Sequence, residues 1–163
     1  MLNLTTRQSI KLLSFGFLTI ALGLVQAQAK SDFTGTWKIN TTKSDFGPMP
    51  PPDSITEKIN QQDPDIKANV ATTGGAQGDM TYDVSYNTEG KETTNTVAGN
   101  EFKSTAKWDG TDLVIDTKGS FSGTEFTSKD RWTLSDDGKT LSVSRHISSA
   151  MGDADMKMVF EKQ

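Results

Sequence analysis

The sequence predicts an all-β protein, built as an antiparallel up-and-down β-barrel of about ten strands. From Asp32 onward no stretch of apolar residues at helical spacing is long enough to predict a helix, whereas alternation with a period of two recurs from end to end. Turn dipeptides separate the alternating runs at spacings of roughly 9 to 15 residues. After residue 54 no long crossover connection interrupts the hairpins. An open β-meander or a sandwich is the alternative, because the same alternation permits it.

The strands follow one another between these turns. We expect them at residues 35–40, 54–61, 65–72, 79–86, 91–98, 101–108, 111–121, 125–134, 140–147 and 153–162. The segment 41–53 is rich in proline, which lacks a backbone donor, so it is expected to form a long loop. A closed barrel is favoured because closure removes the two exposed edges of an open sheet.

Two-residue turns at 109–110, 123–124 and 137–138 predict the register of the later strands. The expected pairs are Ala106 with Leu113, Ser104 with Ile115, Phe121 with Phe126, Ile115 with Trp132, Thr117 with Asp130, Leu134 with Leu141, and Asp130 with Arg145. Each turn brings the apolar faces of two strands together. A slip of one residue would place the apolar set on the opposite face.

The N-terminal segment is predicted to be a secretory signal peptide. Arg7 and Lys11 precede an apolar run from residue 12 to residue 25, and small residues follow up to Ala29. This run of about 14 residues is shorter than the 18 or more that a membrane span needs. We therefore expect residues 1–29 to be removed and residues 30–163 to form one β-barrel domain, periplasmic or secreted, with no membrane span.

Composition excludes several classes of function. The chain of 163 residues has no Cys and a formal net charge of −4, and removal of two basic residues with the signal peptide makes the charge −6. An acidic protein is a poor partner for phosphate backbones, so nucleic acid is not expected as a partner. Disulfide-rich and zinc-finger classes are excluded by the lack of Cys.

Catalysis and metal binding have little support in the sequence. The only His, His146, alternates out of phase with Val143 and is expected on the solvent face without a role. The segment Gly119–Gly123 has Phe121 where a serine nucleophile would be needed. The short carboxylate groups at 136–137 and 153–155 are interpreted as turn residues, because neither has a calcium-loop pattern. We expect a non-enzymatic protein with no metal and no cofactor.

The candidate site lies on the inward face of the later strands. Asp130 and Arg145 are expected to face one another beside Trp132 and Val143. A charge pair on an apolar face is costly unless it is matched. Either the two form a structural clasp, or Arg145 presents its guanidinium to a ligand carboxylate or phosphate while Asp130 orients it. The other candidate ligand-binding residues share this inward phase and a polar side chain: Thr117, Ser104, Ser128, Tyr82 and Glu57.

The first strand carries a family resemblance. Gly35-Thr-Trp37 is similar to the Gly-x-Trp signature of lipocalins. The segments that extend it are 35–40, 43–48, 108–110, 134–141 and 159–162, and together they resemble small exported bacterial lipocalin-like proteins, with calycin-type β-barrels, of unassigned function. The resemblance implies a barrel around a small apolar ligand, with Trp37 sealing the closed end and Gly35 beside it in a structural role. It also implies that interior arginines can bind a ligand head group.

Two hypotheses about function follow. The first is an extracytoplasmic protein that binds a small apolar or amphipathic molecule inside its barrel, because a hydrated interior would satisfy the inward polar groups. The second is a non-catalytic structural or stress-related envelope protein that acts through a protein partner and fills its barrel with its own side chains. The segment Phe46–Pro52 either covers one barrel end or serves as a lid or docking segment.

Overall fold

The computed structural model describes residues 29–75 and 78–163, so the predicted signal peptide lies outside the described residues except for Ala29. Within the described part the regular elements are ten β-strands. They are β1 (Gly35–Ile39), β2 (Ser54–Gln62), β3 (Asp65–Gly75), β4 (Gly78–Asn87), β5 (Thr93–Val97), β6 (Asn100–Asp109), β7 (Asp112–Phe121), β8 (Thr124–Leu134), β9 (Thr140–Ser149) and β10 (Gly152–Lys162). The predicted number and order of strands are confirmed. No helix in the described ranges is long and apolar enough to span a membrane.

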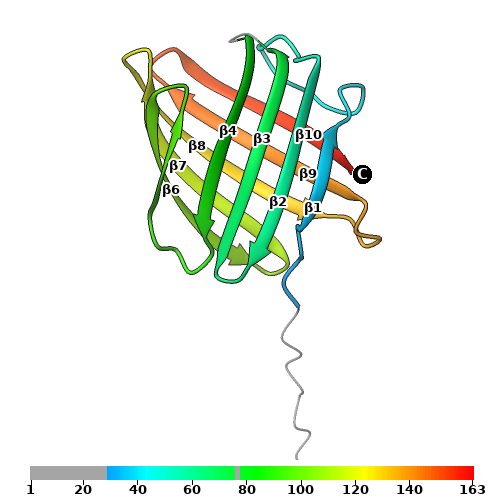
Figure 1. Ribbon diagram of the computed structural model, residues 1–163. Coiled ribbons are helices and arrows are strands. Elements are labelled where there is room, and N and C mark those ends of the chain that lie inside the picture. The colour runs from blue at the N-terminus through cyan, green and yellow to red at the C-terminus, as the bar shows by residue number, and fades with distance from the viewer. Residues whose placement is uncertain (1–28, 76–77) are drawn as a thin grey trace, which may run out of the picture.

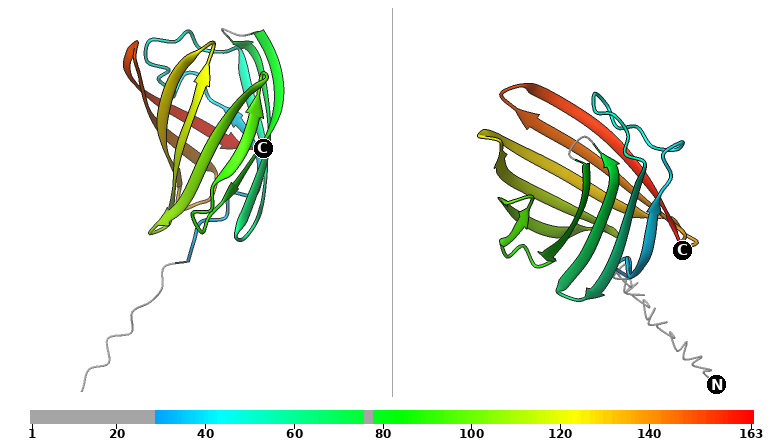
Figure 2. Two further views of the ribbon diagram at one scale, coloured as in Figure 1. Left: turned by 90° about the vertical axis from the view of Figure 1, so that its left-hand side faces the viewer. Right: turned by 45° about the horizontal axis from the view of Figure 1, so that its top comes forward.

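The strands form one antiparallel sheet that curls into a nearly closed barrel (Figure 1). The spatial order is β4-β3-β2-β1-β10-β9-β8-β7-β6-β5, so the first and last strands of the chain lie side by side. Trp37 of β1 pairs with Lys162 of β10, and Ile39 pairs with Phe160. This pairing joins the two halves of the meander. Figure 2 shows how the strands wrap around a common interior.

The seam between β4 and β5 differs from the expected hairpin. Among the described residues no backbone ladder joins these strands, which are the two ends of the strand order. After β4 the chain turns toward β6, where Glu89 forms a bridge with Lys107. The side chain of Asn95 spans the seam, because its Oδ1 accepts from the backbone N–H of Ser85 at 2.8 Å and its Nδ2 donates to the Ser85 carbonyl at 3.0 Å. A side-chain amide thus takes the place of a peptide group in closing the barrel.

The register of β8 against β9 is as predicted, with Leu134 opposite Leu141 and Asp130 opposite Arg145. The two preceding hairpins are shifted by two residues from the prediction. The observed pairs are Ala106 with Ile115, Ser104 with Thr117, Gly119 with Phe126, Thr117 with Ser128, Ile115 with Asp130, and Leu113 with Trp132. A shift of two residues keeps every side chain on its expected face.

Turn geometry explains the shift. Ser122 and Gly123 both have positive φ, at 51° and 81°, so they form the centre of the β7–β8 turn and Phe121 pairs with Thr124. Positive φ at both central residues is the requirement of a type I′ hairpin. The prediction placed Gly123 first in this turn, whereas it is second. In the β6–β7 turn Gly110 is first, with φ of 65°, although the prediction placed it second.

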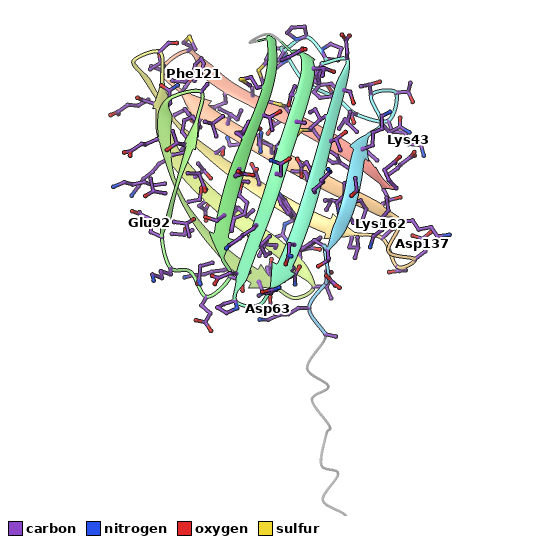
Figure 3. All side chains as sticks on the ribbon, in the orientation of Figure 1. Lys43, Asp63, Glu92, Phe121, Asp137 and Lys162 are labelled. Atoms are coloured by element: carbon purple, nitrogen blue, oxygen red, sulfur yellow. The ribbon has the colours of Figure 1, made fainter. Side chains whose placement is uncertain are left out.

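The hydrophobic core fills one end of the barrel. We call this the Asp63 end and the opposite one the Phe121 end, after residues that Figure 3 labels at the two ends. Phe33 lies ahead of β1 and is fully buried, and it stacks on Trp108 and meets Trp132 edge-on, with ring centroids 5.9 and 5.5 Å apart. Trp37, Leu113 and Leu141 are also fully buried within the core.

The long connection 40–53 lies along β10 instead of forming a strand of its own. Asp45 forms a backbone bridge with Lys157, and Phe46 packs against the core. Met49 is exposed. The predicted loop is confirmed. Of its two large apolar residues, Phe46 packs against the core and Met49 is exposed to solvent.

Candidate functional site

A group of ionisable side chains meets in the middle of the barrel interior. We call it the interior polar cluster: Glu57, Tyr82, Tyr86, Asp130 and Arg145. Glu57 comes from β2 and the tyrosines from β4, while Asp130 and Arg145 come from β8 and β9 on the other side of the strand order. The charges of Arg145 and Asp130 act on Glu57 and on Tyr86, so the members lie close to one another across the interior. Alternation places them all on the inward face.

Arg145 and Asp130 form a two-pronged ion pair. Arg145 Nε donates to Asp130 Oδ1 at 2.8 Å, and Nη2 donates to Oδ2 at 2.5 Å. The side chain of Asp130 is only 7% exposed, whereas that of Arg145 is 35% exposed. The Asp130 carboxylate raises the pKa of Arg145 above its ordinary value, so the guanidinium stays charged although partial loss of water acts in the opposite direction. The clasp expected from the sequence is present, and Arg145 uses two of its five N–H donors in it.

Glu57 is the third charged group of the cluster. Among the described residues it has no hydrogen-bonding side-chain partner, and its neighbours on the adjacent strands are Trp37 and Val70. Loss of water around the carboxyl raises its pKa to about 7, although the positive charge of Arg145 acts in the opposite direction. Loss of water is also the largest cause of the raised pKa values of Tyr82 and Tyr86. The tyrosines are therefore neutral hydroxyl groups beside a carboxyl that changes charge near neutral pH.

The hydroxyl candidates form a second group, separate from the ion pair. Ser104 and Thr117 share a hydrogen bond of 2.8 Å between their hydroxyl oxygens, and Thr117 pairs with Ser128 on the next strand. The predicted opposition of Thr117 and Asp130 is wrong, because the shifted register places Ile115 opposite Asp130. The seven predicted ligand-binding residues thus lie on one face in two groups.

The Phe121 end holds apolar side chains that are less buried than those of the core. Phe102 and Phe126 pack edge to face with centroids 5.4 Å apart, and both are half-buried. Ile55, Met80 and Ile147 are half-buried on the same inward face. The interior therefore has three layers along its axis, namely a packed apolar end, a polar middle and a half-buried apolar end.

The exposure of inward side chains is the observation that favours free space in the interior. Arg145 faces inward beside Val143, yet more than a third of its side chain is accessible. Glu57, Thr117 and Ser128 also face inward and are only half-buried. A side chain on the inner wall keeps accessible surface only where space remains in front of it. The arrangement can hold a molecule with a polar group in the middle layer and an apolar body toward the Phe121 end.

Trp37 closes the Asp63 end with partners that the sequence did not indicate. Its indole N–H donates to the Phe33 carbonyl at 2.8 Å, and the Lys162 ammonium lies 5.2 Å from the centre of its ring. Gly35 has a φ of 149°, which residues with a side chain rarely adopt, and a Cβ there would also lie 2.7 Å from Lys162 Cε, so glycine is favoured at this position. Tyr86 was missing from the predicted site and Phe33 from the predicted seal, although both share the inward phase of their alternating runs.

His146 lies on the outer face as expected, where its Nδ1 is 2.7 Å from Asp155 Oδ1. This carboxylate raises the pKa of His146 above its ordinary value. Over residues 29–75 and 78–163, no three His, Asp or Glu side chains converge in a way that could hold a metal ion.

The barrel is similar to several solved structures at low sequence identity. The barrel is similar to zebrafish ileal bile acid-binding protein complexed with cholic acid, with a TM-score of 0.58 at 19% identity, covering 80% of this chain and 98% of that chain. It is similar to a secretory abundant heat soluble protein from Ramazzottius varieornatus, with a TM-score of 0.61 at 14% identity, covering 84% and 99%. It is also similar to fatty-acid-binding protein 1 of Echinococcus granulosus, with a TM-score of 0.52 at 11% identity, covering 80% and 96%.

The fold is that of the calycin-type β-barrels. No protein-family model and no curated protein matches the sequence. The barrel agrees with the architecture that the Gly35-Thr-Trp37 resemblance implied. At these identities the likeness establishes the calycin-type fold and nothing finer.

Proposed function

We propose that this protein is an exported, non-enzymatic carrier that holds a small amphipathic molecule inside its calycin-type barrel. The observation that carries the proposal is the layered interior, in which an accessible polar cluster lies below a half-buried apolar layer. A polar head at Arg145 and Glu57 and an apolar body against Phe102 and Phe126 would match both layers. Ligand pockets commonly combine apolar walls with a few placed polar groups in this way.

The structural neighbours support the carrier hypothesis. Two of them carry names that describe binding of bile acid or fatty acid, which are amphipathic molecules. The alternative, a structural or stress-related protein with a filled barrel, is less well supported because Arg145, Thr117 and Ser128 keep accessible surface on the inner wall.

Native mass spectrometry of protein purified from its own source tests the proposal directly. We expect an added mass that denaturation removes. A second test uses Ser128→Trp, which inserts a large ring into the interior, with Lys129→Trp on the outer face as its matched control. Binding of a neutral fluorescent probe such as Nile red should be lost in Ser128→Trp and kept in Lys129→Trp. Equal binding by both variants, with circular dichroism showing that both are folded, would contradict an interior site.

Export rests on the segment ahead of the barrel. Arg7 and Lys11 before an apolar run, and Ala29 at its end, support cleavage before Lys30. We expect the N-terminal sequence of protein recovered from the extracytoplasmic fraction to begin at Lys30. Recovery of the whole chain from the cytoplasm with its first residues intact would contradict export.

A further inference from the structure

The charges inside the barrel can be counted strand by strand. The inward titratable groups are Glu57 from β2, Tyr82 and Tyr86 from β4, Asp130 from β8 and Arg145 from β9. On the other strands the inward side chains that the structure describes are apolar, amide or hydroxyl groups, apart from Lys162 at the end of β10, which is exposed and lies over the Trp37 ring. With both tyrosines neutral, the interior holds one positive group and two carboxyl groups.

Asp130 and Arg145 neutralise each other. Their two hydrogen bonds match guanidinium and carboxylate in the geometry of a planar fork. Asp130 is buried, so releasing Arg145 to bind a different anion would leave a carboxylate without a partner in a dry position. The ion pair is therefore a structural part of the wall and supplies no net charge to a ligand.

Glu57 is the group that remains. Its carboxyl faces the interior, it is half-buried, and no side chain in the described ranges donates to it. A half-buried carboxyl has lost part of its water, so a ligand that supplies a donor from the accessible side replaces hydrogen bonds that the protein does not provide. Glu57 pairs with Val70, and Val70 pairs with Tyr82. The Tyr82 ring therefore lies two strands away from Glu57 on the same inner wall.

We propose that the head group taken by this barrel is a hydrogen-bond-donating cation, such as a primary amine, which pairs with Glu57. This inference rests on the proposed interior site and narrows its ligand to cationic amphiphiles. A bound ammonium group makes the charges of Arg145, Asp130, ionised Glu57 and ligand sum to zero. A bound carboxylate would instead leave one excess negative charge with Glu57 protonated, and two with Glu57 ionised. Unbalanced charge in a partly dry interior is strongly unfavourable.

The ionisation of Glu57 gives this pairing a pH dependence. Loss of water raises the pKa of Glu57 to about 7, so in the free protein the carboxyl is mostly neutral at about pH 6 and mostly ionised at about pH 8. Amine binding requires the ionised form and should therefore strengthen about tenfold between these pH values. Binding of a carboxylate should weaken over the same range, and binding of an alcohol should change little.

Three probes with the same chain test the proposal, namely dodecylamine, dodecanoic acid and dodecanol, each competing with Nile red. We expect dodecylamine to bind the parent protein more tightly than dodecanoic acid at about pH 8. Glu57→Gln should weaken dodecylamine about tenfold or more and abolish the pH dependence of its binding, while dodecanol binds as before. Glu125→Gln, which makes the same change at an exposed outer position on β8, should leave all three probes unchanged.

The outcomes separate the two proposals. Failure of all three probes to displace Nile red would contradict the interior site itself. Displacement by dodecanol, with dodecanoic acid binding more tightly than dodecylamine at both pH values, would contradict the cationic head group and leave the interior site intact. Unchanged dodecylamine binding in folded Glu57→Gln would likewise contradict it.

Discussion

The Asp63 end and the middle of the barrel are formed by the same face of the same strands, yet the first is a packed apolar core and the second is a polar layer with accessible surface. On β8, Trp132 and Asp130 are two residues apart and both point inward. Trp132 contributes to a packed apolar core, whereas Asp130 belongs to a polar group beside free space. Alternation thus determines which side chains face the interior, but the chemistry of each layer determines whether that interior is packed or open.

The largest expected effect comes from breaking the packed end. Trp37→Ala should lower the free energy of unfolding by about 3–5 kcal/mol, because it removes a fully buried ring and its hydrogen bond to Phe33. Trp37→Phe keeps most of the apolar volume and should cost about half as much. Denaturant titration measures both. A loss below about 1 kcal/mol for Trp37→Ala would show that this end does not depend on Trp37.

The ion pair in the middle layer should give the next largest effect. Arg145→Gln should lower stability by about 2–4 kcal/mol, because it leaves the buried Asp130 carboxylate without its partner. Arg131→Gln is the matched control, since Arg131 contacts Asp109 and Asp112 on the exposed outer face and should cost about 1 kcal/mol or less. Equal losses in thermal and denaturant unfolding would show that the interior of the barrel is as wet as its surface.

Glu57 tests how dry the middle layer is. Its pKa is raised from 4.5 to about 7 in the folded protein, so the folded state holds a proton that the unfolded state has released. Its contribution therefore lowers stability as pH rises from about 4.5 to about 7, by about 1–3 kcal/mol in total. Comparing the unfolding of the parent protein and Glu57→Gln across this range isolates the effect. A difference that stays constant with pH would contradict the dry environment of Glu57.

The sequence predicted the strands well because alternation and turn residues are local signals. Strand ends are within about three residues of their expected positions, and the inward assignment of Asp130 and Arg145 is confirmed. Register was less accurate because it depends on which turn position Gly110 and Gly123 occupy, and this follows from backbone dihedral angles instead of residue order. A shift of two residues leaves the faces unchanged, so no apolar pattern could reveal it.

Contacts across the interior were beyond local patterns. Glu57 and Arg145 belong to opposite sides of the strand order, and their proximity depends on how the sheet curls. The β4–β5 seam was missed for a related reason, because an alternating run is the same whether its neighbour is joined by a ladder or by the side chain of Asn95. The ligand-binding roles of the predicted residues stay predictions.

The smallest expected effect on stability comes from the half-buried layer at the Phe121 end. Phe102→Ala should lower stability by about 1–2 kcal/mol, well below the 3–5 kcal/mol expected of Phe160→Ala, because Phe160 is fully buried and Phe102 is not. For Nile red binding by the folded variants we expect the opposite order, with Phe102→Ala affected more than Phe160→Ala. Phe102→Ala should weaken Nile red severalfold, since it removes apolar surface that faces the free space, whereas Phe160→Ala should bind nearly as the parent does. If Phe102→Ala destabilised as strongly as Phe160→Ala and left probe binding intact, the Phe121 end would be a second packed core and the difference between the two ends would disappear.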